Sequence, residues 1–320
     1  MRAVRIHQYG GPEVLTLEDV PRPDVVDGEV LIAVHAIGIN PIDWKLREGF
    51  ARERIPLEMP VILGTDISGV VEAVGKGVTR FKVGDPVFSM VGLSGAYAQY
   101  VCVTEALVAN KPKNLNHLEA ASVPLAALTA WQALFVHDNL TAGQTVLIHA
   151  AAGGVGGFAV QLAKAKGARV VATASPPNHD YLRQLGADHL IDYHAGPFEQ
   201  QLETLNIDVD LVVDLVGGET TERSLGLLKT GGRLVQLVPS AAPIVDLAAQ
   251  AGLQATYMTA QPNGDMLEQI SQRFNASELV SNIAASFPFA EIAAAHEMSA
   301  SGRTRGKIVL HFSDDALPRG

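Results

Sequence analysis

One stretch of the sequence limits the choice of fold more than any other: an apolar strand, a glycine-rich turn and an amphipathic helix in direct succession. Residues 146–149 read Val-Leu-Ile-His, and residues 150–157 read Ala-Ala-Ala-Gly-Gly-Val-Gly-Gly. In this order, the N–H groups at the helix start face an anion such as a dinucleotide pyrophosphate. Gly153 would let the backbone approach the phosphates, and Gly156 would let the helix pack closely on the strand, although Ala151 replaces the first glycine of the usual pattern. The alternative is a packing turn that binds no ligand.

The pattern of strands and helices changes near Asn114. Before it, short β-branched segments separated by Gly, Pro and Asp indicate a small barrel or bent sheets. After it, strands alternate with helices, which is typical of a parallel sheet covered on both faces. Beyond Gln261 the first style returns and ends in a strand at 307–312, so we expect this tail to join the N-terminal region. The sequence therefore predicts an α/β protein with two domains.

Composition excludes several classes of protein. The 320 residues are 48% apolar and 18% charged, which suits globular domains with substantial cores. The 24 Lys and Arg against 34 Asp and Glu leave a net charge of −10, so neither nucleic acid nor a membrane is an expected partner. Cys102 is the single cysteine, which rules out an internal disulfide. Because the chain shows no signal-peptide core and no apolar run of about 18 residues, we expect a soluble, cytoplasmic protein.

Six motifs, in order along the chain, resemble the medium-chain dehydrogenase/reductase superfamily, and specifically its zinc-free quinone oxidoreductase branch. The motifs lie at 38–45, 64–69, 83–88, 150–157, 185–188 and 306–309. The resemblance implies a GroES-like irregular β-barrel catalytic domain formed by residues 1–123 and 264–320. It also implies a Rossmann domain, a doubly wound parallel sheet that binds NADP(H), at 124–263. A cleft between the two domains and a homodimer are further implications of the resemblance.

The motifs differ from those of zinc-dependent relatives at the metal site. Asn40 stands where those relatives begin the site with a cysteine, and Gly64-Thr65-Asp66 stands where they carry Gly-His-Glu. The resemblance therefore implies no metal. Without zinc as a Lewis acid, the hydride acceptor has to delocalise the developing negative charge itself. Quinones and α,β-unsaturated carbonyls do so, as a hydroquinone anion or an enolate, with weaker help from hydrogen-bond donors.

The resemblance also implies roles for residues of the catalytic domain. Asn40 and Lys45 are the predicted catalytic residues, with Asn40 donating a hydrogen bond to substrate or cofactor and Lys45 contacting the cofactor ribose or phosphate. The predicted substrate site comprises Asn40, Phe50, Asp66 and Tyr97. Each prediction has a structural alternative: Lys45 as part of a solvated helix face, Asp66 as a buried hydrogen-bonded acid, and the two aromatic residues as ordinary core or surface.

The predicted cofactor residues come mainly from the ends of successive strands. They are Thr129, Ala152, Gly153, Gly154, Val155, Ser175, Asn178, Tyr193, Val216, Leu237, Val238 and Lys307. No acid that would hold the 2′-hydroxyl of NAD follows the second strand before Asp180. Ser175, Asn178 and Tyr193 can instead donate hydrogen bonds to a 2′-phosphate, so we expect NADP(H). Arg183 is the nearest cation, whereas many NADPH-specific relatives place one soon after that strand.

These residues favour an NADPH-dependent oxidoreductase that transfers hydride to a small-molecule quinone or α,β-unsaturated carbonyl without a metal. Two alternatives stay open. One is an enoyl-thioester reductase for acyl-CoA or acyl-carrier substrates, for which Arg47, Arg52 and Arg54 would provide a basic approach. The other is a non-catalytic NADPH-binding protein with a structural or regulatory role, because cofactor binding alone uses most of the same residues.

Overall fold

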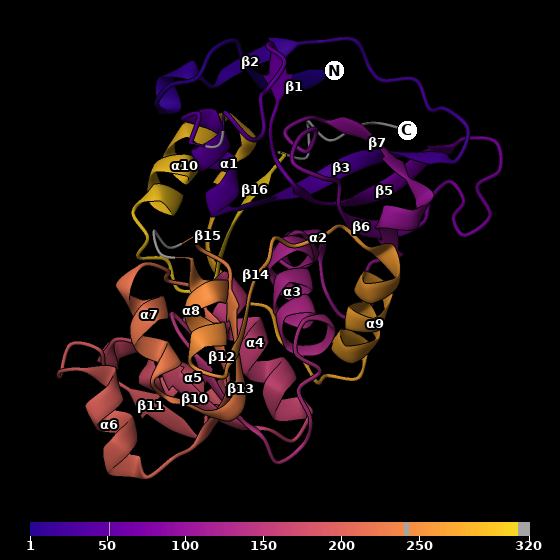
Figure 1. Cartoon of the computed structure of the whole chain (residues 1–320). Coiled ribbons are helices and arrows are strands. Elements are labelled where there is room, and N and C mark those ends of the chain that lie inside the picture. Colours follow the sequence, from indigo (N-terminus) through magenta and orange to yellow (C-terminus); the bar gives the residue numbers. More distant parts are fainter. Residues whose placement is uncertain (51, 240–242, 313–320) are drawn as a thin grey trace. The chain divides into compact units, whose positions relative to one another are not determined.

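The computed structural model describes residues 1–50, 52–239 and 243–312 (Figure 1). The chain divides into two compact units, which are described separately. Unit 1 consists of Met1–Leu128 and Gln261–Gly320, and unit 2 consists of Thr129–Ala260. These limits lie a few residues from the predicted domain boundaries. Within the described ranges, no helix is both long enough and apolar enough to cross a membrane.

Unit 2 is built on a sheet of six parallel strands. They are β9 (Thr145–Ile148), β10 (Arg169–Thr173), β11 (His189–Ile191), β12 (Val209–Asp214), β13 (Leu228–Gln236) and β14 (Gln254–Tyr257). Their order across the sheet is β11-β10-β9-β12-β13-β14. The chain thus runs from the centre to one edge, returns, and then runs to the other edge. This is the doubly wound order, and it confirms the predicted fold class for this part of the chain.

Among the residues of unit 2 that the structure describes, five α-helices connect the strands. They are α4 (Gly154–Ala165), α5 (His179–Leu185), α6 (Phe198–Leu205), α7 (Glu219–Leu225) and α8 (Ile244–Gln250). Helices α4 and α5 contact each other, as do α7 and α8. Because connections between parallel strands are right-handed, the reversal of strand order places the two helix pairs on opposite faces of the sheet. The carboxyl ends of β9 and β12 flank the point of reversal, where sheets of this kind bind their ligands.

Unit 1 is rich in strands. They are β1 (Arg2–Ile6), β2 (Thr16–Asp19), β3 (Glu29–Ile39), β4 (Val61–Ile62), β5 (Asp66–Val74), β6 (Pro86–Met90), β7 (Tyr100–Thr104), β8 (Val108–Asn110), β15 (Ile283–Pro288) and β16 (Lys307–His311). The larger sheet has the order β15-β16-β3-β5-β6-β8, with β7 also paired to β3, and the smaller sheet has the order β2-β1-β4. The long strand β3 is central, and its buried Ile32, Val34 and Ile37 belong to the main apolar core of the unit.

Four α-helices lie wholly within the described part of unit 1. They are α1 (Pro41–Arg47), α2 (His117–Ala121), α9 (Gly264–Asn275) and α10 (Ile292–Ala300). Helix α1 begins with a proline, which suits the first helical position because its missing N–H has no partner there anyway. A further helix, α3 (Pro124–Trp131), crosses the limit between the units and continues as a π-helical turn at Gln132–Val136. Pro124 is the first residue of α3 and separates this helix from α2.

Candidate functional site

The carboxyl end of β3 lies between β16 and β5 and brings three predicted site residues together. In the sheet register Gly38 stands opposite Asp66, the first residue of β5. Asn40 follows β3 directly and lies beside Lys307, the first residue of β16. Glycine is needed at position 38, because a Cβ there would lie 2.3 Å from the carbonyl oxygen of Ala121. The backbone at Gly38 is therefore packed closely against that of Ala121, next to the point where these side chains meet.

Asn40 is buried, and every polar atom of its side-chain amide has a partner. Its Nδ2 donates to Thr65 Oγ1 at 2.8 Å and to Asp66 Oδ2 at 3.0 Å, and its Oδ1 accepts a hydrogen bond from Lys307 Nζ. The Lys307 amine also donates to the Ile39 carbonyl at 3.1 Å and lies 3.6 Å from Asp66 Oδ2. Lys307 and Asp66 thus form a buried ion pair whose two members both bind the Asn40 amide.

A second buried acid, Asp43, lies beside this ion pair. Its Oδ2 accepts hydrogen bonds from the Asn40 backbone N–H and the Tyr97 hydroxyl, both at 2.8 Å. Its Oδ1 accepts a longer bond from the Thr65 hydroxyl at 3.4 Å. The bond to Asn40 satisfies a backbone donor at the start of α1. Asp43, Asp66 and Tyr97 are each 0% exposed, so the predicted substrate residues Asp66 and Tyr97 are interior side chains in this structure.

The charges of this buried group shift one another's pKa values. Burial raises the pKa of Asp43 to about 7, and negative Asp66 adds to the rise, while hydrogen bonds from Asn40 and Tyr97 and the positive charge of Lys307 oppose it. Burial also raises the pKa of Asp66 and lowers that of Lys307, and the attraction between the two opposes both shifts. We treat Lys307 and Asp66 as an ionised pair, because each is the nearest opposite charge of the other.

The hydrogen bonds continue from Tyr97 through His296 on α10 and return to Arg47 at the end of α1. The Nε2 of His296 lies 2.9 Å from Tyr97 Oη, and its Nδ1 lies 3.2 Å from a terminal guanidinium nitrogen of Arg47. Burial, with the charge of Arg47, lowers the pKa of His296 to about 3, so the ring is neutral at pH 7. Arg47 is 1% exposed, donates to the Gly10 carbonyl and pairs with Glu48. The suggested role of Arg47 in a basic surface for acyl-thioesters is therefore wrong.

The glycine-rich turn of unit 2 joins β9 to α4. Gly153 precedes the helix in an extended conformation, with φ −73° and ψ 177°. The N–H of Gly157 donates to the Gly153 carbonyl, which closes the first turn of the helix. The N–H groups of Gly154, Val155 and Gly156 come before that bond and so have no partner inside the helix. Together with the positive end of the helix dipole, they form a place for an anion.

Two glycines of this turn have different roles. A Cβ on Gly156 would lie 2.6 Å from backbone atoms of Ala150 and Ala151, so only glycine allows the helix to pack this closely on the turn. A Cβ on Gly153 would meet only the Ala150 carbonyl oxygen, at an ordinary 3.4 Å. The protein itself therefore has room for a Cβ at position 153. A bound pyrophosphate would need that room, and the turn fits a dinucleotide in this respect.

Other predicted cofactor residues lie past the carboxyl ends of neighbouring strands. Past β10, Asn178 Nδ2 donates to Ser175 Oγ at 3.0 Å, so these two side chains are held together. Past β12, the N–H of Val216 donates to Asp214 Oδ1 at 2.8 Å. Past β13, Leu237 donates to the Asp214 carbonyl at 3.0 Å. The neighbouring pairs Val216-Gly217 and Leu237-Val238 are in contact, because a Cβ on Gly217 would lie 2.8 Å from the Val238 side chain.

The remaining predicted residues lie outside these groups. Tyr193 is half exposed, and its ring contacts that of His194 at a tilt of 45°, with centroids 4.3 Å apart. Thr129 is buried in α3. Lys45 is partly exposed on α1, with its ammonium 5.6 Å above the ring of Trp44. Phe50 follows α1 and is 77% exposed.

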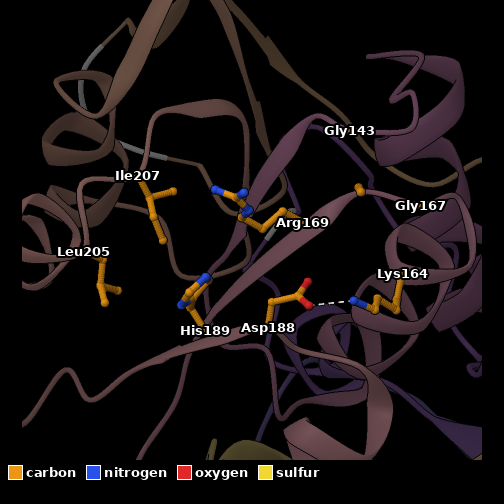
Figure 2. A pocket seen from close by; sticks show the side chains of 9 residues that line it. Gly143, Lys164, Gly167, Arg169, Asp188, His189, Leu205 and Ile207 are labelled. Carbon is orange, nitrogen blue, oxygen red and sulfur yellow. Dashed lines mark hydrogen bonds and ion pairs between the residues drawn. The ribbon is translucent and has the colours of Figure 1, made fainter.

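A cavity of about 540 Å³ in unit 2 lies elsewhere (Figure 2). Figure 2 shows Arg169, His189 and the Lys164–Asp188 ion pair on its wall. Arg169 begins β10 and His189 begins β11, so the cavity lies at the amino ends of these strands. The glycine-rich turn follows the carboxyl end of β9. The cavity is therefore not the predicted nucleotide site.

Sequence reasoning did not predict roles for Thr65 and His296, which complete the buried polar cluster. His296 is a single histidine in a helix, and no motif marks it. The indole N–H of Trp44 is also buried without an acceptor in the described ranges. Across the same ranges, no three His, Cys, Asp or Glu side chains come close enough to hold a metal ion.

Two family models match the chain: the alcohol dehydrogenase GroES-like domain at residues 26–113 and the zinc-binding dehydrogenase at residues 185–310. The NAD(P)H oxidoreductase RTN4IP1, mitochondrial, of Danio rerio is 34% identical, over 98% of this chain and 92% of the relative. The structure of the quinone oxidoreductase from Coxiella burnetii has a TM-score of 0.90 and 38% identity, covering 98% of this chain and 99% of that one. The Escherichia coli quinone oxidoreductase complexed with NADPH has a TM-score of 0.89 and 29% identity, covering 97% and 100%. The chain therefore belongs to the quinone oxidoreductase branch of the medium-chain dehydrogenase/reductase superfamily, with the predicted GroES-like and Rossmann parts.

Proposed function

We propose that this protein is an NADPH-dependent oxidoreductase that transfers hydride to quinones or α,β-unsaturated carbonyls without a metal. The observation that carries the proposal is the placement of the Lys307 amine, which binds Asn40 Oδ1 and pairs with Asp66. Asn40 and Asp66 stand where zinc-dependent relatives carry ligands. In this protein the Lys307 ammonium is the positively charged partner of both side chains. The remaining member at those positions, Thr65, is a neutral hydroxyl that serves Asn40 and Asp43.

This arrangement bears on which substrates can react. An ordinary ketone develops a full negative charge on oxygen when it accepts hydride, and that charge needs strong stabilisation such as a Lewis acid. The Lys307 ammonium is buried, and Asp66 already neutralises its charge. It would therefore stabilise a negative charge on a substrate oxygen only weakly. Quinones and conjugated carbonyls spread the charge over their own π system. They therefore need mainly correct placement beside the nicotinamide.

The chain's own residues would hold the cofactor, which supplies the hydride when bound. In the proposal, the N–H groups of Gly154, Val155 and Gly156 bind the pyrophosphate. The paired Ser175 and Asn178 donate hydrogen bonds to the 2′-phosphate. Tyr193, which follows β11 by two residues, is the third proposed donor. In unit 1, Asn40 and Lys45 are the proposed catalytic residues. Both amide hydrogens of Asn40 are already donated, so a substrate oxygen would replace Thr65 or Asp66 as an acceptor.

A panel of acceptors tests the substrate class. Purified protein is mixed with NADPH and a simple quinone, a short 2-alkenal or crotonyl-CoA, and the loss of NADPH absorbance is followed. We expect turnover with the quinone or the alkenal. Turnover with the thioester alone would replace the proposal with an enoyl-thioester reductase. Tight NADPH binding without turnover of any acceptor would identify a non-catalytic binding protein.

The cofactor preference has its own test. Ser175→Asp places a carboxylate where the 2′-phosphate is proposed to bind, so charge repulsion should weaken NADPH specifically. We expect KM for NADPH to rise by about tenfold, equal to about 1.4 kcal/mol, while KM for NADH changes little. The neighbouring Asp180→Asn, on an exposed acid paired with Arg183 at the start of α5, serves as a control for general changes past β10. An unchanged ratio of the two KM values in Ser175→Asp would show that the phosphate binds elsewhere.

We also propose a homodimer. In the described part of unit 2, β14 ends the sheet and so presents one edge of unpaired backbone groups, and its Tyr257 is 43% exposed. Light scattering coupled to size-exclusion chromatography should give about twice the chain mass of 33.9 kDa. A mass of a single chain at micromolar concentration would refute the dimer.

A further inference from the structure

A line of four side chains in the interior of unit 1 starts at Arg47 and returns to Asp43, one turn earlier on the same helix α1, by way of His296 on α10 and Tyr97. The guanidinium of Arg47 contacts His296 Nδ1 at 3.2 Å, His296 Nε2 contacts Tyr97 Oη at 2.9 Å, and the Tyr97 hydroxyl contacts Asp43 Oδ2 at 2.8 Å. All four are nearly or completely buried, with 0–1% exposed. Glu48 and the Gly10 carbonyl hold the other guanidinium nitrogens of Arg47.

The chemistry of Arg47 fixes the direction of every bond in this line. A guanidinium has only donors, so the facing Nδ1 of neutral His296 has to be an acceptor. The single ring proton of His296 is therefore on Nε2 and is donated to Tyr97 Oη. Because the Tyr97 oxygen accepts that proton, its own hydrogen is left for Asp43 Oδ2. Three donated bonds, one after another, thus point from Arg47 toward the Asp43 carboxylate.

We propose that Arg47, His296 and Tyr97 are positioning residues, which direct hydrogen bonds onto Asp43 so that its carboxylate holds the Asn40 backbone and Thr65 in the arrangement needed for turnover. As far as turnover is concerned, this inference rests on the proposed function. Asn40 would be the residue that meets substrate or cofactor. The other three act on it only through Asp43.

A proton on Asp43 would disturb this arrangement. Both the Asn40 N–H and the Tyr97 hydroxyl donate to Oδ2, so a proton on Oδ1 would have only Thr65 Oγ1 to bond. That would reverse the contact with Thr65 and leave the hydroxyl hydrogen of Thr65 without an acceptor in the cluster. The same hydroxyl accepts from Asn40 Nδ2, so the disturbance would reach the Asn40 amide.

The groups around Asp43 set the pH at which this proton binds. Burial and negative Asp66 raise the pKa, whereas Lys307, the Asn40 N–H and the Tyr97 hydroxyl lower it, with a result of about 7. His296 faces Asp43 through Tyr97, whereas Arg47 lies one turn from Asp43 on α1, so its positive charge is also a direct neighbour of Asp43. Because Asp43 would titrate near neutral pH, a bond gained or lost on its carboxylate would move the active pH range measurably.

Five variants test the proposal in the full-length protein. Tyr97→Phe removes the bond to Asp43, and Asp43→Asn removes the titrating group. Arg47→Met removes the obligatory donor, which lets His296 change tautomer and compete with Asp43 for the Tyr97 hydrogen. Arg47→Lys keeps a donor-only cation and is the conservative rescue. Tyr100→Phe, a buried tyrosine elsewhere in the unit, is the matched control for loss of a hydroxyl.

The first readout is the carboxyl carbon-13 resonance that disappears in Asp43→Asn, followed against pH. We expect its apparent pKa to rise by about one unit in Tyr97→Phe, since a hydrogen bond to a charged group is lost. Arg47→Met should raise it by less, and should raise it no further when combined with Tyr97→Phe, because the line is already broken there, whereas a direct effect of the Arg47 charge would persist in the double variant. Arg47→Lys and Tyr100→Phe should leave it unchanged. An unchanged titration in Tyr97→Phe, or equal shifts in the two Arg47 variants, would overturn the directed line. This readout needs no substrate, so it remains informative if no acceptor is reduced.

The second readout is the pH profile of kcat with the best acceptor. The acid limb should follow the resonance in each variant and be absent in Asp43→Asn, while KM for NADPH stays within roughly two-fold. The acid limb of the kcat profile could persist in Asp43→Asn, or stay in place when the pKa of the Asp43 resonance shifts. Either result would show that the line affects Asp43 but does not position residues for turnover. Absence of turnover together with the expected resonance shifts would instead refute the proposed function and leave the directed line standing.

Discussion

The glycine-rich turn of unit 2 and the buried polar cluster of unit 1 are built in opposite ways. The turn comes from eight consecutive residues, 150–157, and presents backbone N–H groups. The cluster comes from segments up to 267 residues apart and consists of side chains, two of which form a buried ion pair. A site made of backbone N–H groups is accessible only where no side chain blocks the approach of the ligand. A site made of buried charges depends on every partner being present.

The largest effect should come from removing the cation of the cluster. Lys307→Met leaves the Asp66 carboxylate buried without its ion-pair partner, so the free energy of unfolding should fall by about 3–5 kcal/mol. Urea denaturation at neutral pH measures this loss. Lys307→Arg should lose less, because it keeps the charge.

A surface pair provides the control for Lys307→Met. Lys82 is 85% exposed at its side chain and lies 3.8 Å from Asp85, so Lys82→Met should change the free energy of unfolding by less than about 0.5 kcal/mol. Equal effects of the two substitutions would mean that Asp66 is not charged in the folded protein. The cluster would then not depend on a buried ion pair.

Asp43 should make stability depend on pH in an unusual direction. Its pKa is about 7 in the folded protein and near its ordinary value of 3.8 when unfolded, so between these values the folded state binds the proton more tightly. The contribution of Asp43 to the free energy of unfolding is therefore full below about pH 4 and is lost as the pH rises to about 7. The loss is about 4 kcal/mol at most, judged from the shift.

Urea denaturation of the wild type and Asp43→Asn across this pH range isolates that contribution. The difference between their free energies of unfolding should change steadily from about pH 4 to about pH 7 and level off above it. A difference that stays constant with pH would mean that Asp43 titrates at an ordinary value. In that case its burial would not govern its charge.

For the turn, the expected effect is on binding rather than on folding. The protein has room for the Cβ that Gly153→Val adds, and the valine side chain would occupy the approach of a pyrophosphate, so Kd for NADPH should rise by about 100-fold, equal to about 2.7 kcal/mol. Isothermal titration calorimetry measures the affinity, and thermal unfolding without cofactor checks the fold. Gly226→Val, at a position of the same unit where a Cβ would meet only the Arg223 carbonyl oxygen at 3.7 Å, should leave Kd unchanged. Retained affinity in Gly153→Val would place the phosphates elsewhere.

The smallest effect concerns backbone strain in the same turn. Ala150 has φ 50°, in the left-handed region that favours glycine. Ala150→Gly should therefore raise the free energy of unfolding, by about 0.5 kcal/mol once the extra freedom of glycine in the unfolded chain is deducted. Ala165→Gly, on the exposed end of α4, should lower it by a similar amount. Destabilisation by Ala150→Gly would show that no strain is stored at this residue.

The turn could be predicted from sequence because all of its physics is local. The order of strand, glycines and helix determines where the free N–H groups lie, and the alternation of strands and helices predicts the parallel sheet around them. Short helices and strands could not be predicted from such local patterns. Helix α6 buries only Phe198 and Leu202, and β14 is a four-residue edge strand, so neither repeats its pattern often enough to be recognised.

The cluster could be predicted only in part. Resemblance to a family singled out Asn40, Asp66 and Lys307, but their mutual bonds depend on the pairing of β16 with β3, which no local pattern reveals. Arg47 follows polar and apolar neighbours that resemble a solvated helix face, and it is buried because α1 packs against α10. The same packing of α1 against α10 brings His296 into contact with Arg47, which no sequence pattern indicates.

Turnover measured on a sample of known metal content tests the central claim most directly. The protein is dialysed against a strong chelator, its zinc content is determined by mass spectrometry, and NADPH oxidation by a quinone is measured on the same sample. If Lys307 is the cation of the cluster, the rate should be unchanged with far less than one zinc per chain, and added zinc should not raise it. Activity that disappears on chelation and returns with one equivalent of zinc would contradict the account.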